Sequence, residues 1–158
     1  MNHNFRENAH YWTTSSCIDP ATREAAKVLL NEGNEKVLQD HFGTTLSFGT
    51  GGLRGVVGVG NNRMNLYTVR RATAGVARYL KQQFSDVIGY DSRHFSKEFA
   101  ETTAEVFLAE GFYVFLFKEL CPTPQLSFEI IRQQALGGVM ITASHNPPNY
   151  NGYKAYWK

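Results

Sequence analysis

Hydrophobic positions in the middle of the chain recur every three or four residues, the spacing that is typical of an amphipathic helix. They begin at Leu66 and predict one long helix that ends at Phe84. Beyond it, short apolar runs alternate with further helical patterns, and apolar runs bounded by turn residues indicate buried strands. We expect strands at residues 87–90 and 112–117 and from Gly137 to the turn at Ser144, and helices capped by Ser96 and Thr123.

The alternation of strands and helices decides the expected fold class. Strand–helix–strand units of this spacing are joined by right-handed crossovers, which gives a mainly parallel sheet with helices on both faces. We therefore predict an α/β fold with three layers, an α/β/α sandwich. The last run, residues 151–158, follows a tight turn. We expect it to form a strand antiparallel to the one before it, so that the sheet is mixed.

The first 43 residues differ from the rest and predict an N-terminal helical arm. Residues 1–19 are polar and show no period, whereas Asp19 and Pro20 offer an N-cap followed by a proline in the first helical turn. We expect helices at residues 20–31 and 34–42, each ended by a glycine. The arm would end at residue 43.

The main domain, residues 44–158, opens with an alternating segment at 44–48 that predicts a strand. Six glycines then fall between Gly49 and Gly60 and predict a loop or hairpin. Their backbone N–H groups, together with Arg54, could approach a phosphate. The run lacks the lysine and the serine or threonine that close a P-loop, so on its own it is more typical of a flexible hairpin.

Composition and charge narrow the functional classes. The 158 residues are 42% hydrophobic, enough for one domain with a hydrophobic core. The formal net charge is +2 without a basic block, which gives no indication of nucleic acid as a partner. No window is apolar enough for a membrane span, and Cys17 and Cys121 give neither a disulfide framework nor metal-ligand spacing. We expect a soluble cytoplasmic protein.

Ser144 is the first candidate for chemistry. It follows the apolar run at 137–141, and Pro147 and Pro148 keep the turn from winding into a helix, so its hydroxyl should be exposed. A serine hydroxyl is a weak nucleophile that needs a base or a carried group. The adjacent His145 is a poor partner, because neighbouring side chains on an extended loop diverge, and the Gly-x-Ser-x-Gly pattern of hydrolases is absent. A proline turn with an incidental serine is the alternative.

Three cations beside turn signals complete the candidate site. Arg93 follows a strand end as Ser144 does, and in a parallel sheet both strand ends lie at one edge. Lys154 lies ten residues after Ser144, so a hairpin would return it close to the serine. As a general base it must lose its proton, which a neighbouring cation such as Arg54 would favour. Taken singly, each cation is more often a solvated charge or part of an ion pair.

Three motifs in this order resemble those of one family, the α-D-phosphohexomutases, or phosphoglucomutase and phosphomannomutase superfamily. TASHNPP at 142–148, followed by YNGYK at 150–154, resembles the active-serine motif. FGTGGLRG at 48–55 is similar to the family's early arginine loop, and GYDSR at 89–93 to its strand-end Asp-x-Arg. The N-terminal part is most similar to the branch that includes phosphoglucomutases, phosphopentomutases and glucose-1,6-bisphosphate synthase.

The resemblance implies that Ser144 carries a phosphoryl group and passes it to a sugar monophosphate through a bisphosphate intermediate. It implies Lys154 as the general base, His145 as a supporting group, and Arg54 and Arg93 as phosphate-binding residues. It also implies Mg²⁺ bound to the phosphoserine of Ser144 and a sugar bisphosphate as activator. Such charge compensation suits a phosphoserine, which brings about −1.5 to −2 charges.

The family's enzymes have four domains, and this sequence resembles the first. The metal loop with its three carboxylates, the sugar-specificity loop and the last phosphate-binding loop are absent. We therefore expect the remaining domains of the same polypeptide to be the partners of these residues, and negligible mutase activity from the 158 residues alone. The resemblance implies a phosphoglucomutase or phosphomannomutase, with a phosphopentomutase or a glucose-1,6-bisphosphate synthase as the alternative, and the sugar itself is left open. Two interpretations remain as alternatives: a serine hydrolase, and a non-catalytic module that binds sugar phosphates.

Overall fold

The computed structural model describes residues 5–80 and 85–157. Its centre is a five-stranded sheet in the order β1-β5-β4-β2-β3. β2 runs parallel to β3 and β4, whereas β5 runs antiparallel to β4 and β1, which confirms the mixed sheet and the antiparallel last strand. The strands are β1 (Gly52–Val56), β2 (Ser85–Tyr90), β3 (Tyr113–Leu116), β4 (Gly137–Ile141) and β5 (Tyr150–Trp157).

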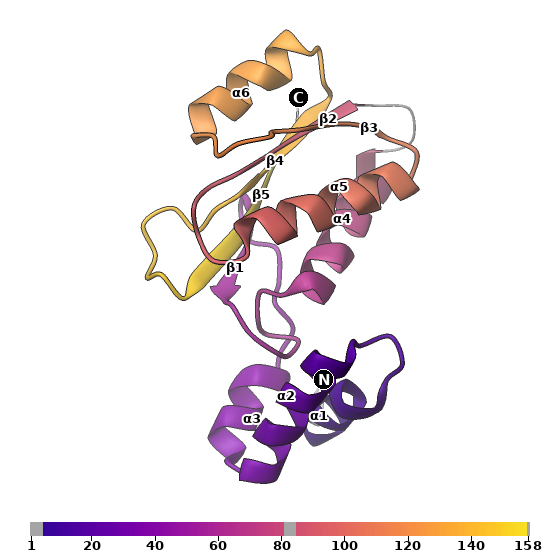
Figure 1. Cartoon of the computed structure of the whole chain (residues 1–158), viewed down its shortest axis with the longest axis vertical. Coiled ribbons are helices and arrows are strands. Elements are labelled where there is room, and N and C mark those ends of the chain that lie inside the picture. Colours follow the sequence, from indigo (N-terminus) through magenta and orange to yellow (C-terminus); the bar gives the residue numbers. More distant parts are fainter. Residues whose placement is uncertain (1–4, 81–84, 158) are drawn as a thin grey trace.

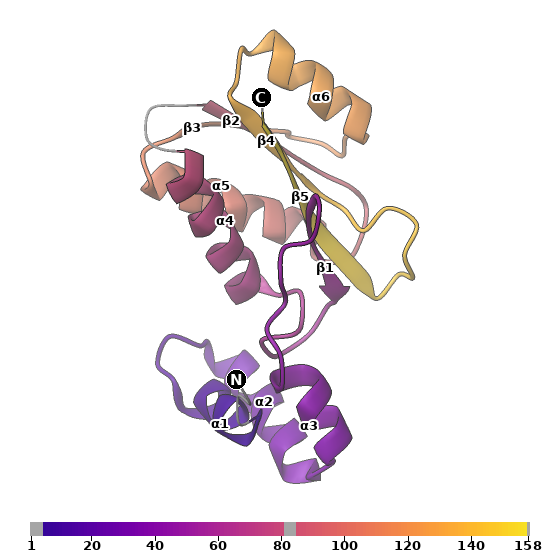
Figure 2. The same cartoon turned by 180° about the vertical axis from the view of Figure 1, so that it is seen from behind.

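Helices cover both faces of this sheet, so the predicted α/β/α sandwich is confirmed (Figures 1 and 2). Successive side chains of a strand point to opposite faces. Ile88 and Val139 accordingly pack against α4 and α5, whereas Val87 and Met140 pack against α6. The helices are α4 (Leu66–Leu80), α5 (Ser96–Ala109) and α6 (Thr123–Arg132). Phe84, the expected end of the long helix, lies outside the described residues.

Three N-terminal helices enclose a hydrophobic cluster of their own: α1 (Phe5–Thr14), α2 (Pro20–Glu32) and α3 (Glu35–Phe42). α2 and α3 confirm the sequence predictions. Asp19 caps α2 by accepting from Thr22 N. Hydrogen bonds from the side chain and from the backbone of Thr22 lower the pKa of Asp19 to about 2. α1 was not expected, because its apolar face is short. Its buried residues nevertheless have helical spacing, since Ala9 and Trp12 lie three positions apart on one face of α1.

These helices are tied to the segment that precedes α4. The Trp12 indole donates to Asn61 Oδ1 (2.8 Å), and the buried Arg63 pairs with Asp40. Asp19 accepts from the hydroxyl of Tyr67 on α4 (2.8 Å). The N-terminal helices therefore rest on the loop between β1 and α4. The division into an arm at 1–43 and a domain at 44–158 stays a prediction.

The start of the main domain differs from expectation. Residues 44–48 form no strand, because Leu46 N donates to Asn61 O and the chain turns back by a Gly49 N–Gly52 O bond. The strand is β1, within the glycine run. Gly52 has φ 145°, and a Cβ there would lie 1.9 Å from the Tyr153 carbonyl oxygen. Glycine is needed because β5 approaches too closely for any side chain.

Two expected helix caps are also wrong. Ser96 is the first residue of α5, and the cap position is held by Phe95 in a left-handed conformation with φ 63°. The Ser96 hydroxyl is instead engaged by Asp91. Thr123 is likewise the first residue of α6, after Pro122. In both cases the polar side chain lies one residue too late to accept from the helix N-terminus.

One polar pair lies inside the core on the α4 and α5 face. Burial raises the pKa of Asp86 to about 7. Burial also raises the pKa of Tyr153, and the charge of Asp86 adds to this. Thr73 lies close enough to Tyr153 to oppose the rise, but its hydroxyl donates to Val69 O (2.9 Å). Among the described residues, Asp86 Oδ1 and the Tyr153 hydroxyl have no hydrogen-bond partner.

Across residues 5–80 and 85–157, the helices are too short or too polar to cross a membrane.

Candidate active site

The expected meeting of two strand ends is confirmed. β2 and β4 are parallel neighbours, and Tyr90 is paired with Ile141 at their carboxyl ends. The ladder continues one step further, where Asp91 N donates to Ile141 O (3.2 Å). The segment from Asp91 to Arg93 therefore lies beside the loop that joins β4 to β5, residues 142–149, which we call the serine loop. It projects from the carboxyl end of β4 (Figure 1).

Ser144 is exposed in the serine loop, and no helix forms around it, as predicted. Its backbone has φ 56°, a left-handed conformation that is uncommon for a residue with a Cβ. Its N–H donates to Thr142 Oγ1 (2.9 Å), and the next turn is closed by Asn146 N donating to Ala143 O (3.1 Å). An unfavourable backbone angle at an exposed hydroxyl persists only where surrounding contacts impose it, and such residues cluster at functional sites.

Arg93 supplies the largest set of those contacts. Its Nη2 donates to the carbonyl oxygens of Ser144 (2.8 Å) and Asn146 (2.7 Å). Its Nη1 donates to the carbonyl oxygens of Pro147 (2.9 Å) and Tyr150 (3.0 Å). The arginine thus binds the backbone of the serine loop from beneath, and its side chain is 15% exposed. Phosphate binding by Arg93 stays a prediction.

Asp91 and Ser96 connect this arginine to the scaffold. Asp91 Oδ1 accepts from Arg93 N (3.0 Å) and from the Ser96 hydroxyl (2.7 Å), and Oδ2 lies 3.6 Å from Arg93 Nε. The fully buried Asn151 donates to Ser96 Oγ (3.0 Å) and to His94 O (2.9 Å). The start of α5 and the start of β5 are therefore joined directly below the serine loop.

Arg54 reaches the serine loop from β1. Its Nη1 donates to Asn146 Oδ1 (2.8 Å). The strand register places Arg54 opposite Gly152 and Gly52 opposite Lys154. Because Leu53 and Tyr153 point into the core, Arg54 and Lys154 share the other face of the sheet. Two cations and the serine loop thus occupy one side of the β1–β5 edge.

Lys154 is less close to Ser144 than a hairpin alone suggested. The β4–β5 hairpin is confirmed, but Lys154 is paired with Met140, four residues before Ser144. Lys154 and Arg54 line one hollow of about 440 Å³, while Ser144 and Arg93 line another of about 360 Å³. In the described part of the chain, the Lys154 ammonium forms no hydrogen bond or ion pair.

His145 stands beside Ser144 without forming a hydrolase triad. Its Nδ1 lies 3.4 Å from Ser144 Oγ, longer than the 2.5–3.2 Å typical of a strong hydrogen bond. Within residues 5–80 and 85–157, no carboxylate orients its ring. A serine nucleophile in a hydrolase needs both a base and a group that orients that base. This arrangement speaks against the hydrolase alternative, and the supporting role of His145 stays a prediction.

The donor set for a metal is incomplete. The described residues contain no group of three His, Cys, Asp or Glu side chains that could hold an ion. Asp91 lines the Ser144 hollow, but Arg93 and Ser96 already engage its oxygens. Mg²⁺ takes several oxygen ligands in a nearly octahedral arrangement. These side chains alone do not fit a magnesium site, so Mg²⁺ at a phosphorylated Ser144 stays a prediction.

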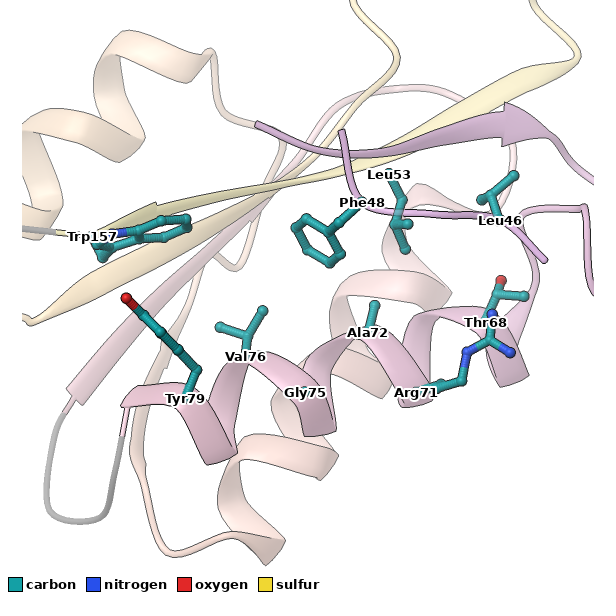
Figure 3. A pocket seen from close by; sticks show the side chains of 10 residues that line it. All are labelled: Leu46, Phe48, Leu53, Thr68, Arg71, Ala72, Gly75, Val76, Tyr79 and Trp157. Carbon is teal, nitrogen blue, oxygen red and sulfur yellow. The ribbon is translucent and has the colours of Figure 1, made fainter. Parts of the chain in front are cut away.

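A separate apolar groove of about 480 Å³ lies on the opposite face, between α4 and the β1–β5 edge (Figure 3). Phe48 and Leu53 face α4 across it, and Trp157 meets Tyr79 edge to face at one end. Of its described lining residues, Arg71 alone carries a charge. Its hydroxyls are those of Thr68, which donates to Arg63 O and Asn65 O, and of the exposed Tyr79. The candidate active site is therefore the face that carries Ser144, Arg54 and Lys154.

The sequence model of one protein family matches residues 45–158. Its description is phosphoglucomutase/phosphomannomutase, alpha/beta/alpha domain I. The chain belongs to this family. The resemblance of the three motifs is thereby confirmed, and the phosphoglucomutase/phosphomannomutase match starts close to the expected start of the main domain.

Members of the family with known names share much of the sequence. A phosphopentomutase from Pongo abelii is 45% identical over 148 residues, which are 86% of this chain and 24% of that protein. A phosphoglucomutase from Staphylococcus epidermidis is 42% identical over 142 residues, 88% of this chain and 26% of that protein. A solved structure from Thermus thermophilus, assigned as a phosphomannomutase, gives a TM-score of 0.66 at 34% identity over 72% of this chain and 26% of that one.

The chain therefore spans about a quarter of the length of these phosphoglucomutase/phosphomannomutase relatives.

Sequence reasoning overlooked two residues of the site. Asn146 links Arg54 to the serine loop, and Thr142 accepts from the Ser144 N–H. Both lie within the TASHNPP motif, so their position was a signal, but their contacts depend on the fold. The left-handed conformation of Ser144 had no signal, because serine rarely adopts it.

Proposed function

We propose that this chain is the phosphoserine-bearing domain of a sugar phosphomutase and that Ser144 is the phosphoryl carrier. The observation that carries the proposal is the exposed Ser144, held in a left-handed conformation at a strand end by Thr142 and Arg93. Arg54 is bound to the same loop through Asn146. The relatives support the class of reaction, because the named ones are phosphopentomutases and phosphoglucomutases.

The proposed step exchanges one phosphate ester for another. Ser144 Oγ attacks a phosphoryl group of a sugar bisphosphate, the Oγ–P bond forms, and the bond from phosphorus to the sugar oxygen breaks. The hydroxyl proton leaves Ser144, and the sugar oxygen gains a proton. In the reverse direction a free hydroxyl of a sugar monophosphate receives the group. Such transfers are catalysed mainly by positioning and charge neutralisation.

Arg54 and Lys154 would neutralise the added charge. A phosphoserine at Ser144 brings about −1.5 to −2 charges, and both cations share its side of the sheet. We propose Lys154 as the base for the sugar hydroxyl rather than for Ser144, because it lines the neighbouring hollow. A sugar that spans both hollows would place its hydroxyl between the lysine and the phosphoserine. His145 would support the Ser144 hydroxyl from 3.4 Å.

The remaining parts of the proposal come from the family. We propose sugar monophosphates as substrates, with transfer between the 1-position and the 5- or 6-position, and a sugar bisphosphate as activator. When bound, Mg²⁺ would balance the charge of the phosphoserine, with the missing oxygen ligands coming from outside the described residues. The candidate substrates are glucose, mannose and pentose phosphates, and a bisphosphate synthase activity is the alternative reaction. We also propose a cytoplasmic location.

Peptide mass spectrometry tests the carrier. The protein is expressed from the complete reading frame that contains these 158 residues and is incubated with glucose 1,6-bisphosphate. We expect one added phosphoryl group on Ser144 and none in the Ser144→Ala variant. Ser92→Ala is the matched control, because Ser92 is an exposed serine that lines the same hollow. A stable phosphate in Ser144→Ala, with full turnover, would overturn the proposal.

The same samples separate the alternatives. An acyl-directed fluorophosphonate that labels Ser144 would favour a serine hydrolase. Saturable binding of the bisphosphate without transfer to Ser144 would favour a non-catalytic sugar-phosphate module. We expect transfer and no fluorophosphonate labelling.

A further inference from the structure

We propose that Arg93 is a positioning residue for Ser144. Its guanidinium imposes the left-handed backbone from which the Ser144 hydroxyl is presented, and it acts on phosphoryl transfer without binding phosphate. The inference rests on the proposed function and deepens it.

Four of the five hydrogen-bond donors of Arg93 are used, and the fifth lies within an ion pair. A guanidinium has five N–H groups, four of them on Nη1 and Nη2. Those two nitrogens make four hydrogen bonds of 2.7–3.0 Å to backbone carbonyls of the serine loop and the start of β5. The fifth group, on Nε, faces Asp91 Oδ2 at 3.6 Å. A phosphate could bind Arg93 only by replacing one of these contacts.

The charge of Arg93 is also matched locally. Its side chain is 15% exposed and that of Asp91 27%, and the two form an ion pair. A cation paired in this way presents little net charge to a phosphate on the surface. Arg54 has no paired carboxylate within the described ranges, and its Nη1 bonds a neutral amide. The division of roles between the two arginines follows from their partners.

Thr142 and Arg93 together fix the backbone on both sides of the catalytic hydroxyl. The Ser144 N–H is held by Thr142, and the Ser144 carbonyl is held by Arg93. With both neighbouring peptide groups held, φ at Ser144 stays positive although its side chain disfavours that angle. Without the arginine, the carbonyl is free to turn and the residue can relax to a right-handed or extended conformation, which moves Oγ.

The same arginine sets the position of Arg54. Arg93 restricts the movement of Asn146, because Nη2 binds its carbonyl while the Asn146 side chain binds Arg54. The Ser144 hydroxyl and Arg54, the cation that would bind the phosphate on it, are thus both positioned by the Arg93 guanidinium. Lysine cannot reproduce this, since its three donors radiate from a single nitrogen instead of a planar fork.

The test compares Arg93→Lys and Arg93→Gln with Arg71→Lys in the complete protein, using glucose 1,6-bisphosphate as phosphoryl donor. Arg71 is the control, because it is an exposed arginine that lines the groove on the opposite face. We expect the rate of Ser144 phosphorylation to fall about 100-fold in both Arg93 variants, with the KM for the bisphosphate within about threefold, because displacing a reacting group by about 1 Å costs this much. Arg71→Lys should change neither value.

Hydrogen exchange gives a second readout that does not need activity. The amides of Ser144 and Asn146 should exchange faster in the Arg93 variants, while those of β4 keep their protection. A raised KM with an unchanged limiting rate would overturn the proposal, because it is the behaviour of a phosphate-binding residue. Unchanged exchange in the serine loop would overturn it as well. If the unsubstituted protein never phosphorylates Ser144, the proposed function fails, and exchange alone still decides whether Arg93 holds the loop.

Discussion

Arg54 on β1 donates a hydrogen bond of 2.8 Å to the side chain of Asn146, 92 residues later in the chain. The bond crosses from an edge strand to the serine loop and brings a cation to the side of the sheet that Lys154 also faces. Asn146 is neutral, so it holds the arginine without cancelling its charge. A carboxylate at this position would hold Arg54 more tightly and leave less attraction for a phosphate.

This charge relationship is testable with Asn146→Asp. We expect phosphorylation of Ser144 by glucose 1,6-bisphosphate to slow at least about tenfold, because the new charge pairs with Arg54 and repels the incoming phosphoryl group. Asn149→Asp is the control: it adds the same charge to an exposed position of the same loop. Equal rates for the two variants would mean that the Arg54–Asn146 contact does not matter to transfer.

Gly52 should be essential for the attachment of β1. A Cβ at this position would lie 1.9 Å from the Tyr153 carbonyl oxygen, and φ is 145°. We expect Gly52→Ala to lower the free energy of unfolding by about 3 kcal/mol, the range of severe backbone clashes. Urea unfolding measures it. Gly51→Ala is matched, because nothing lies within 4 Å of its Cβ position, and it should change stability by less than about 1 kcal/mol.

The positive φ of Ser144 predicts that glycine at this position gives a more stable protein than alanine, the reverse of the usual order. A left-handed residue with a Cβ costs about 1–2 kcal/mol, which glycine avoids. We expect Ser144→Gly to be more stable than Ser144→Ala by about 0.5–1 kcal/mol in urea unfolding, after the greater chain entropy of glycine is allowed for. Ser92 is absent from the positive-φ residues, so there glycine should be the less stable of the pair. Alanine being the more stable at both sites would contradict the assigned strain.

Because Asp86 is buried, we expect the free energy of unfolding to fall as the pH rises. Burial raises its pKa from 3.8 to about 7, so the folded state holds a proton that the unfolded state has lost. The favourable contribution is complete below about pH 4 and lost as the pH passes 7. Asp86→Asn removes the titration. The stability of this variant relative to the unsubstituted protein should rise by on the order of 4 kcal/mol between pH 4 and 8.

Asp19, whose pKa is shifted in the opposite direction, is the control for these measurements at different pH. Its pKa is lowered to about 2 by hydrogen bonds at the α2 N-terminus, so its contribution is present above about pH 4 and lost in acid. Asp19→Asn should therefore lose its deficit relative to the unsubstituted protein as the pH falls from about 4 to about 2. Chemical unfolding at each pH measures both variants. A pH-independent difference for Asp86→Asn would show that Asp86 is already ionised in the folded protein.

The layers of the fold could be predicted because local and global patterns agree there. The apolar run of β4 is buried at each of its five positions, as expected of a strand covered on both faces. α2 was likewise marked by Asp19, whose side chain does cap it. In these places the sequence preference and the tertiary environment favour the same structure.

The site was predictable only in part, because its contacts are long-range. The alternating residues 44–48 suggested a strand, but the glycines after them allow a closer approach to β5, and β1 forms there instead. Arg93 and Ser144 were each identified next to a strand end. That the arginine binds the carbonyls of the serine loop follows from the packing of β2 beside β4, which no local pattern contains.

The β4–β5 hairpin that carries Ser144 also restricts where residues can be inserted into or deleted from this part of the chain. Gly152 lies against the Thr142 and Leu53 carbonyl oxygens, where a Cβ would approach to 2.6 and 2.9 Å, so only one alignment of β5 with its neighbours is open. Sliding β5 by one residue would replace Gly152 with a residue that carries a side chain, which would clash with the Thr142 and Leu53 carbonyl oxygens. It would also turn Lys154 toward the apolar groove beside α4. Substitutions in the serine loop can be absorbed one at a time, whereas inserting or deleting a single residue in β5 would exchange the charged face for the apolar one.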